Sequence, residues 1–208
     1  EYLAVAQLQE AVELRKAGVT RPILVMGVPR PADLPVFTDN DIDILVASPQ
    51  WARAIADHVG ESNRLSVHVK VDTGMHRLGM GPSEVDQTLE TLSTCQGVHL
   101  AGLWTHLASA DEADSPFSYE QHAVLRPIIE RFGSRFDHVH VAASHAVHFF
   151  PEIGAYGTDG LIRIGLSLYG YLQDPDAARE VGLQPVMRVV SRVAQTRIVD
   201  AGESVSYN

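Results

Sequence analysis

The chain has 208 residues and a formal net charge of −10 at pH 7, with 45% hydrophobic and 20% charged residues. These values are typical of a globular protein long enough to bury a core, and the absence of a basic cluster makes nucleic acid and anionic membranes poor candidates as partners. The single Cys95 excludes an internal disulfide and suits a reducing, cytoplasmic compartment, and no apolar run approaches the ~20 residues of a membrane span.

Short apolar runs alternate with helical segments along most of the chain. Strands are predicted over residues 3–6, 22–27, 42–47, 64–71, 98–106, 138–143 and 161–169. Helices are predicted over residues 7–18, 48–59, 81–94, 116–132 and 145–150, the second of them with Ser48 as its N-cap. Prolines at positions 29, 31 and 35 are expected to break up the connection after the second strand. Strands that alternate with helices and lack period-2 polarity indicate a parallel sheet covered by helices.

Seven β units before Gly170 are one short of a closed (β/α)8 barrel. Because the chain opens on Glu1 and closes on VSYN in mid-pattern, we interpret both ends as cuts through a longer protein. The predicted fold is therefore an incomplete TIM-type barrel that lacks its first strand. A doubly wound sheet is the alternative, but the sequence has no G-x-G-x-x-G phosphate loop.

The pattern changes after Pro185. The segment VMRVVSRVAQTRIVDAGESVSYN predicts two strands joined by short turns, with no helix between them. About 25 residues cannot form a domain alone. We therefore divide the chain into a barrel over residues 1–184 and the beginning of a C-terminal β domain over residues 185–208.

Polar residues at strand ends are the candidates for chemistry, because barrel active sites gather there. Within or just past predicted strands lie Lys70, Arg77, His106, Ser144 and Arg163. The segment that carries the first two, VHVKVDTGMHRLGM, has an alternative interpretation as an edge strand with solvent-facing side chains followed by an ordinary glycine turn. For His106, the alternative is a structural role. Arg163, inside an apolar strand, needs a carboxylate, a ring nitrogen or a phosphate as partner, and a structural salt bridge would also satisfy it.

Several other chemistries lack support in the sequence. His138, His140, His145 and His148 cluster, but their spacing matches no zinc pattern, so no metal site is predicted. Cys95 has no defined partner and is interpreted as a packing residue. The sequence has neither a G-x-S-x-G elbow nor an H-E-x-x-H motif, so a serine hydrolase and a zinc peptidase are not indicated.

Seven segments together resemble the alanine racemases, pyridoxal 5′-phosphate (PLP) enzymes with a (β/α)8 barrel and a C-terminal β domain. In order along the chain they are LAVAQLQEAVELRKAG, HVKVDTGMHRLGM, GLWTHLASADE, ASHAVHFFP, LIRIGLSLYG, QPVM and AGESVSY. The resemblance covers the whole chain. It implies a cytoplasmic homodimer that interconverts L- and D-alanine for peptidoglycan, through an aldimine with PLP and two bases.

The resemblance also implies roles for single residues. Lys70 matches a lysine that is often carbamylated in this family and then positions the neighbouring arginine. Arg77 matches that arginine, which reaches the phenolic oxygen of the cofactor and the substrate carboxylate. His106 would lie against the pyridine ring, and Tyr207 matches the base that one subunit contributes to its partner.

The remaining implied roles concern the two ends of the cofactor. Ser144 and the Gly165 and Leu166 amides would hold the phosphate. Arg163 would donate to the pyridine nitrogen. An arginine does not give up its proton, so it leaves the ring a weaker electron sink than an aspartate partner would, which disfavours transamination.

The chain departs from the family pattern at three places. The Schiff-base lysine of the family belongs on the first barrel strand, which is expected before Glu1, so we expect the isolated chain to be inactive. Ala143 stands where the family usually has Asn, and Asn208 where it usually has Gly. His76 takes a position that the family often fills with Asn and has no predicted role.

Three alternatives to alanine racemisation remain open at this point. A serine or broader-specificity racemase of the same fold would share every residue named above. A non-catalytic PLP-binding barrel protein would lack the β domain, so the AGESVSY segment argues against it. An inactive homologue is disfavoured because Lys70, Arg77, His106, Arg163 and Tyr207 are all present.

Overall fold

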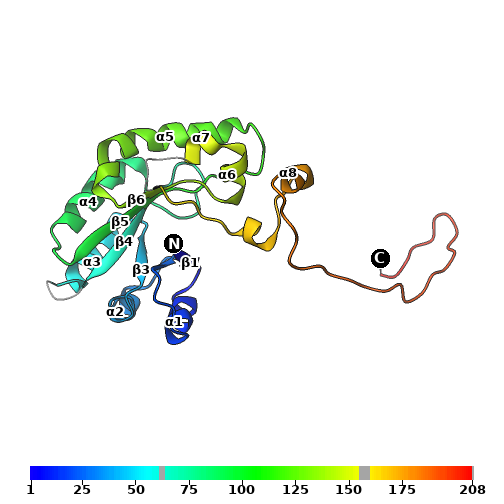
Figure 1. Cartoon of the computed structure of the whole chain (residues 1–208), viewed down its shortest axis with the longest axis horizontal. Helices are drawn as coiled ribbons and strands as arrows, with labels where there is room; N and C mark the ends of the chain where they lie inside the picture. The colour runs from blue at the N-terminus through cyan, green and yellow to red at the C-terminus, as the bar shows by residue number, and fades with distance from the viewer. Residues whose placement is uncertain (61–63, 155–159, 208) are drawn as a thin grey trace.

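The computed structural model describes residues 1–60, 64–154 and 160–207. Six parallel strands form one sheet in chain order, so every connection passes from one strand to its neighbour. They are β1 (Leu3–Val5), β2 (Ile23–Val25), β3 (Asp43–Val46), β4 (Leu65–Lys70), β5 (Val98–Trp104) and β6 (His138–His140). The sheet curls, and helices cover its outer side, so that the strands form a partial TIM barrel (Figure 1).

Eight α-helices lie in the described residues. They are α1 (Leu8–Lys16), α2 (Leu34–Asp39), α3 (Pro49–His58), α4 (Val85–Ser93), α5 (Pro116–Phe132), α6 (Ser144–Phe149), α7 (Pro151–Gly154) and α8 (Pro175–Glu180). Four short 3₁₀ segments accompany them: η1 (Pro31–Asp33), η2 (Pro82–Glu84), η3 (Gly133–Arg135) and η4 (Leu166–Tyr169). Among the described residues, none of these helices is long and apolar enough to cross a membrane.

Two local sequence signals had contrasting outcomes. The predicted N-cap of α3 is confirmed, since Ser48 Oγ accepts a hydrogen bond from the Trp51 amide at 3.3 Å. The expectation that prolines break up the connection after β2 is wrong, because η1 and α2 form there. Pro31 and Pro35 stand in the first turns of these helices, where a missing backbone N–H breaks no helical hydrogen bond.

The strand predicted over residues 161–169 is also wrong. The structure has only an isolated bridge between Ala143 and Arg163, followed by η4. Arg163 N donates to Ala142 O at 2.9 Å, so the segment runs beside the end of β6 on one side only. From Gly165 onward, the Gly165 and Ser167 amides donate to the Ser144 hydroxyl in place of strand pairing, and the backbone turns into η4.

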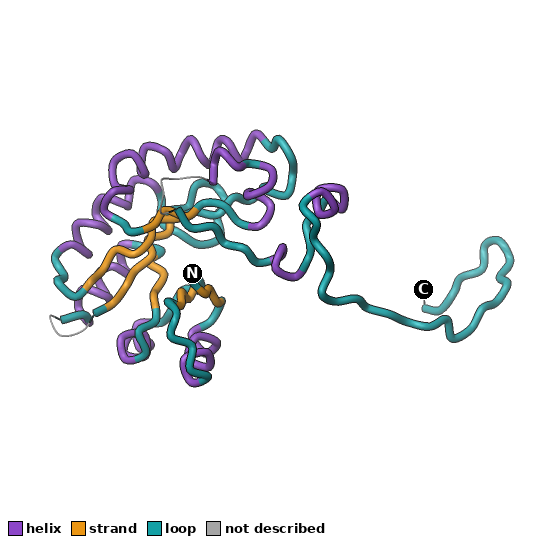
Figure 2. Tube along the Cα trace, viewed as in Figure 1, coloured by secondary structure: helices purple, strands orange, loops and turns teal. Residues whose placement is uncertain are grey.

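The segment after Pro185 forms no strand within residues 186–207, and it projects away from the barrel as an extended chain (Figures 1 and 2). Val189 and Ile198 are 91% and 98% exposed. A strand needs a partner for its backbone hydrogen bonds, and the described residues supply none here, so the two predicted strands are absent. That this segment begins a second domain stays a prediction.

The hydrophobic core lies between the sheet and its helices. Val67, Val69 and Val71 are fully buried and pack in that core, whereas His68 and Lys70 point to the opposite, inner face. The alternation follows from the period of two along a strand. The alternative that β4 is a solvent-facing edge strand is therefore excluded, because β3 and β5 pair with it on both sides.

Candidate active site

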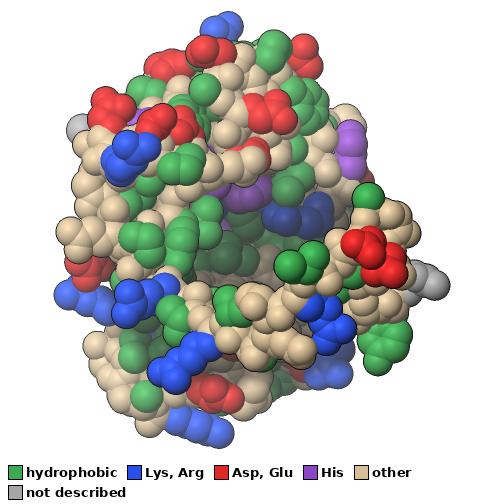
Figure 3. Space-filling view, turned by 90° about the vertical axis from the view of Figure 1, so that its right-hand side faces the viewer, with side chains coloured by type: hydrophobic (Ala, Val, Ile, Leu, Met, Phe, Trp, Pro, Cys, Tyr) green, Lys and Arg blue, Asp and Glu red, His purple; other side chains and the backbone are tan. Residues whose placement is uncertain are grey.

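A pocket of about 930 Å³ opens on the inner face of the curled sheet. Figure 3 shows this hollow with basic and histidine side chains on its wall. Seven of the eight residues singled out from the sequence line it: Lys70, Arg77, His106, Ser144, Arg163, Gly165 and Leu166. Segments nearly a hundred residues apart in the chain thus meet at one site.

The eighth residue, Tyr207, lies elsewhere. It stands near the end of the extended C-terminal segment and is 99% exposed. It does not line the described pocket. Its predicted role as a base contributed across a dimer stays a prediction.

The pocket is cationic. Its wall contains Lys70, Arg77 and Arg163, and Glu1 is the only acidic residue among those described there. A cavity lined by one sign of charge attracts ligands of the opposite sign. The site therefore fits a small anion.

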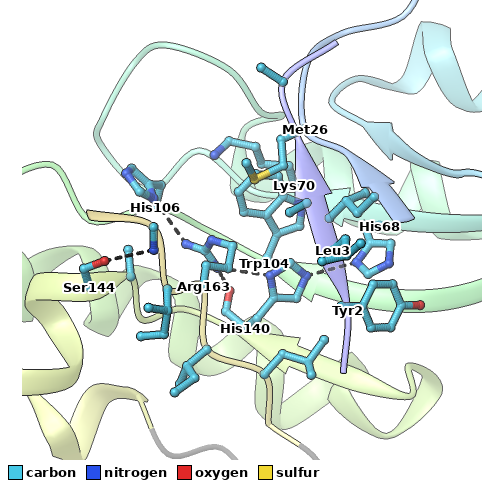
Figure 4. Close-up of a pocket in the computed structure, with 18 of the residues that line it drawn as sticks. Tyr2, Leu3, Met26, His68, Lys70, Trp104, His106, His140, Ser144 and Arg163 are labelled. Carbon is cyan, nitrogen blue, oxygen red and sulfur yellow. Dashed lines mark hydrogen bonds between the residues drawn. The ribbon is translucent and has the colours of Figure 1, made fainter. Parts of the chain in front are cut away.

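Arg163 is the most heavily bonded side chain in the pocket (Figure 4). Its NH1 group donates to His140 Nδ1 at 3.0 Å and to His140 O at 2.8 Å. Its NH2 group donates to Thr105 O at 2.8 Å, Val141 O at 2.9 Å and His106 Nδ1 at 3.2 Å. Its Nε–H has no partner among the described residues. Burial lowers the pKa of Arg163 to about 9. This value is still high enough for the guanidinium to be protonated at neutral pH.

His106 is a neutral imidazole. Burial, followed by the charges of Arg163, Lys70 and Arg77, lowers its pKa to about 4. Because its Nδ1 accepts from Arg163, its proton resides on Nε2. A flat, neutral ring beside the arginine can pack against an aromatic ligand without adding charge.

Gln121 of α5, which the sequence did not single out, holds the backbone around His106. Its Nε2 donates to His106 O and to Thr73 Oγ1, both at 3.1 Å, and its Oε1 accepts from Ala108 N at 2.8 Å. Gln121 is fully buried. A buried amide with all these partners satisfied fixes the loop that follows β5.

Lys70 lies on the pocket floor, only 3% exposed, with Nζ 3.9 Å from the centre of the Trp104 ring. Burial, followed by the charges of Arg163 and Arg77, lowers its pKa from 10.5 to about 7. The amine is therefore largely unprotonated above neutral pH. An unprotonated amine is the form that reacts with electrophiles such as carbon dioxide.

Arg77 is exposed at the pocket mouth on a tight turn after β4. Asp72 Oδ1 accepts from the amides of Gly74 at 3.0 Å and His76 at 3.1 Å, which shapes the turn. His76 has φ of +55°, in the left-handed region that Asn tolerates best after Gly. This explains physically why Asn suits the position, and it gives His76 a backbone role.

Ser144 begins α6 and meets the turn that leads into η4. Its Oγ accepts from Gly165 N at 3.0 Å and from Ser167 N at 3.3 Å. A hydroxyl and two backbone amides thus converge at one end of the pocket, with Leu166 between the two amides in the chain. Because both amides donate to this hydroxyl oxygen, the Ser144 O–H proton is the donor that this group can offer to an anion.

The histidine cluster of the sequence separates in the structure. His140 contacts Arg163, and its ring stacks on Trp104 with centroids 5.3 Å apart and an interplanar angle of 11°. His145 lines the pocket, and its Nε2 accepts from Gln173 N at 3.0 Å. No group of three or more metal-ligating side chains is found in the described residues. The period-2 alternation of β4 and β6 was the available signal for His68 and His140, since each strand turns alternate residues inward.

The fold and its inward-facing polar residues define a partial (β/α)8 barrel with a ligand site on its inner side. The chain belongs to the alanine racemase family, whose N-terminal domain matches residues 1–173. The alanine racemase of Desulfovibrio desulfuricans is 37% identical over 212 residues, which cover 99% of this chain and 56% of that protein. The chain thus spans about half the length of the curated relatives it matches.

Solved structures agree with the family. The alanine racemase of Clostridium difficile 630 is 31% identical, with a TM-score of 0.78 over 89% of this chain and 49% of that one. A histidine racemase from Leuconostoc mesenteroides subsp. sake is 25% identical, with a TM-score of 0.73 over 81% of this chain and 45% of that one. The predicted family and fold are confirmed.

Proposed function

We propose that these residues form the cofactor-binding barrel of a cytoplasmic, homodimeric, PLP-dependent racemase that interconverts L- and D-alanine for peptidoglycan synthesis. The observation that supports it is the joint placement of Arg163, His106 and Ser144 around one cationic pocket. Each belongs to a segment that resembles the alanine racemases. Relatives named alanine racemase match nearly the whole chain, which supports the same substrate.

The residues present fit PLP. Arg163 lines the pocket, and its Nε–H, which has no partner among the described residues, suits the pyridine nitrogen, an acceptor when the ring is neutral. Ser144 accepts from the Gly165 and Ser167 amides, so its own O–H proton can be donated to a phosphate, beside the predicted Gly165 and Leu166 amides. The cavity of about 930 Å³ falls within the size range of small-molecule sites.

PLP, when bound, withdraws electrons from the α-carbon of an amino acid and so makes its proton acidic. The contribution of this chain is to bind and orient. Arg163 holds a permanent positive charge at the ring end without transferring a proton, and neutral His106 packs beside it. Arg77 at the pocket mouth is placed to donate hydrogen bonds to a carboxylate.

Lys70 has an orienting role in this proposal. Of the two lysines in the chain, Lys16 and Lys70, only the second lines the described pocket. Reaction of its free amine with carbon dioxide would give a carbamate, whose negative charge could hold Arg77. The resemblance assigns the Schiff base to a different lysine. We therefore expect the 208-residue chain to bind PLP without racemising alanine.

The test is equilibrium binding of PLP to this chain, followed by cofactor absorbance. Ser144→Ala should weaken binding about tenfold, the loss of one hydrogen bond to a charged group. Ser93→Ala, on the exposed end of α4, is the matched control and should bind as the parent chain does. No PLP binding by the parent chain would contradict the proposal. D-alanine formed from L-alanine at enzymatic rates would contradict the expectation that this chain alone is inactive.

The second candidate is a racemase of broader or different amino-acid specificity. The histidine racemase from Leuconostoc, with the same fold, is the observation that favours it. Competition among alanine, serine and histidine for the PLP-loaded pocket separates the two. Competition by alanine, with none by serine or histidine, supports the first proposal.

A further inference from the structure

A line of hydrogen bonds crosses the inner face of the sheet beneath the pocket (Figure 4). Arg163 NH1 contacts His140 Nδ1 at 3.0 Å, and His140 Nε2 contacts His68 Nδ1 at 3.0 Å. His68 Nε2 then contacts Asp43 Oδ2 at 3.2 Å, and Tyr2 Oη donates to the same oxygen at 2.7 Å. The line joins side chains from β6, β4 and β3 to the arginine.

The direction of every bond in this line follows from its two ends. Arg163 can only donate, so His140 Nδ1 accepts and its proton resides on Nε2. That proton is donated to His68 Nδ1, so the proton of His68 also resides on Nε2. Asp43, as a carboxylate, can only accept it. Both histidines are thereby fixed as neutral Nε2–H tautomers.

Burial makes these assignments consequential. His68, His140 and Asp43 are 0%, 1% and 5% exposed. Burial, followed by the charge of Arg163, lowers the pKa of His140 well below 6.5, which agrees with a neutral ring. Among the described residues no carboxylate contacts Arg163 directly, so Asp43 is the anion to which its hydrogen bonds lead.

The sheet is shaped to allow the two histidines to meet. His68 on β4 and His140 on β6 flank β5, and Gly102 lies between them. A Cβ at position 102 would lie 2.1 Å from His68 Nδ1 and 2.9 Å from His140 Nε2. Only the absent side chain of Gly102 lets the rings approach across the middle strand. The register of β4 against β5 shifts between Val67, which pairs with Leu100, and His68, which pairs with Gly102.

We propose that Asp43, His68 and His140 are positioning residues that fix the orientation of Arg163 and supply its remote counter-charge. His140, held in turn by His68 and Asp43, accepts from NH1 of Arg163. The Nε–H is then the donor proposed for a ring nitrogen. The identity of that ring as PLP rests on the proposed function. The line of hydrogen bonds from Arg163 to Asp43, called the relay below, does not rest on it, because the relay is formed by this chain alone.

The primary test is NMR of the chain with 15N-labelled histidine, without cofactor. Ring correlations report which nitrogen carries the proton. His68 and His140 should each show a single Nε2–H tautomer. A proton on Nδ1 of either ring, or on both nitrogens, would overturn the relay.

Asp43→Asn is the decisive variant. The amide oxygen can still accept from His68 Nε2, and His140 stays fixed by Arg163, so both rings should keep their tautomers while the negative charge is removed. Without this counter-charge Arg163 should bind PLP about tenfold more weakly, as for one lost charge-assisted hydrogen bond. Asp137→Asn is the matched control, because Asp137 forms a comparable but exposed pair with His99 at 2.6 Å. It should change neither ring nor affinity.

His68→Leu is the second variant, in case Asp43→Asn fails to fold. An aliphatic side chain can neither accept from His140 nor donate to Asp43, so it interrupts the line of hydrogen bonds. PLP affinity should again fall about tenfold. Affinity within twofold of the parent chain in a folded variant would overturn the proposal. If the parent chain binds no PLP, the proposed function fails, and the tautomers alone decide the relay.

Discussion

Replacing Lys70 with methionine should stabilise the protein, and the gain should depend on pH. The ammonium is buried on the pocket floor, and its pKa is lowered from 10.5 to about 7. Each pKa unit corresponds to about 1.4 kcal/mol, so confining this lysine costs at most about 5 kcal/mol at pH 7. The contact with Trp104 offsets up to about 2 kcal/mol of this cost for the charged form. A gain of about 3 kcal/mol remains, which is large against a typical total stability of about 5–15 kcal/mol.

The sign of the pH dependence follows from the two pKa values. Between pH 7 and 10.5 the unfolded chain binds the Lys70 proton and the folded chain does not. The free energy of unfolding of the parent chain therefore rises with pH across this window, by at most about 1.4 kcal/mol per pH unit from this group. Lys70→Met lacks this contribution, so its advantage should shrink as pH rises and vanish near pH 10.5.

The assay is urea denaturation of both proteins at several pH values between 6.5 and 9.5, followed by tryptophan fluorescence. Carbon-dioxide-free buffer is required, because a carbamate would replace the cation by an anion. Lys16→Met is the control, since Lys16 is exposed on α1. Stability curves for Lys70→Met and the parent chain that run parallel across this range would refute the reasoning.

Three further outcomes follow from the same contacts. Ser48→Ala should lower the free energy of unfolding by about 1 kcal/mol, measured by urea denaturation, because the Trp51 amide loses its cap. His106 should stay neutral from pH 8 down to about pH 4, so NMR should show no ring protonation near pH 6.5, and its contribution to stability should be lost as pH falls from 6.5 to about 4. The rate at which a small amine-specific reagent modifies Lys70 should level off above about pH 7, scored by peptide mass spectrometry, and a rate that keeps rising up to pH 10 would contradict the lowered pKa.

Much of the fold could be predicted because its signals are local. The helix over residues 116–132 was predicted with the bounds of α5, and the alternating valines of β4 indicated a strand. The segment 161–169 failed because its apolar, β-branched composition is that of a strand, whereas its structure is set by Ser144, more than 15 residues earlier. A contact so distant in sequence leaves no local pattern.

The site was predicted unevenly for a related reason. Lys70 and His106 stand at or just past strand ends, Arg163 lies in an apolar segment, and all three match a family pattern, so they could be named before their geometry was known. His68 and Asp43 stand inside strands, and their role depends on which strands become neighbours and on an empty space at Gly102. Gln121 acts from the inner side of a helix on a loop. Such residues are recognised only when the packing is known.

The alternation of side chains along β4 also protects the fold against misassembly. If β4 slipped by one residue against its neighbours, Lys70 and His68 would turn toward the helices, and the three valines would turn toward the pocket. A charge placed in that apolar layer without a partner costs several kcal/mol, so the shifted pairing is strongly disfavoured. The ionisable residues that prepare the pocket for a ligand therefore also select a single register while the chain folds. A variant with apolar residues in place of both His68 and Lys70 should be more stable, but β4 should pair in the wrong register more often as the chain folds.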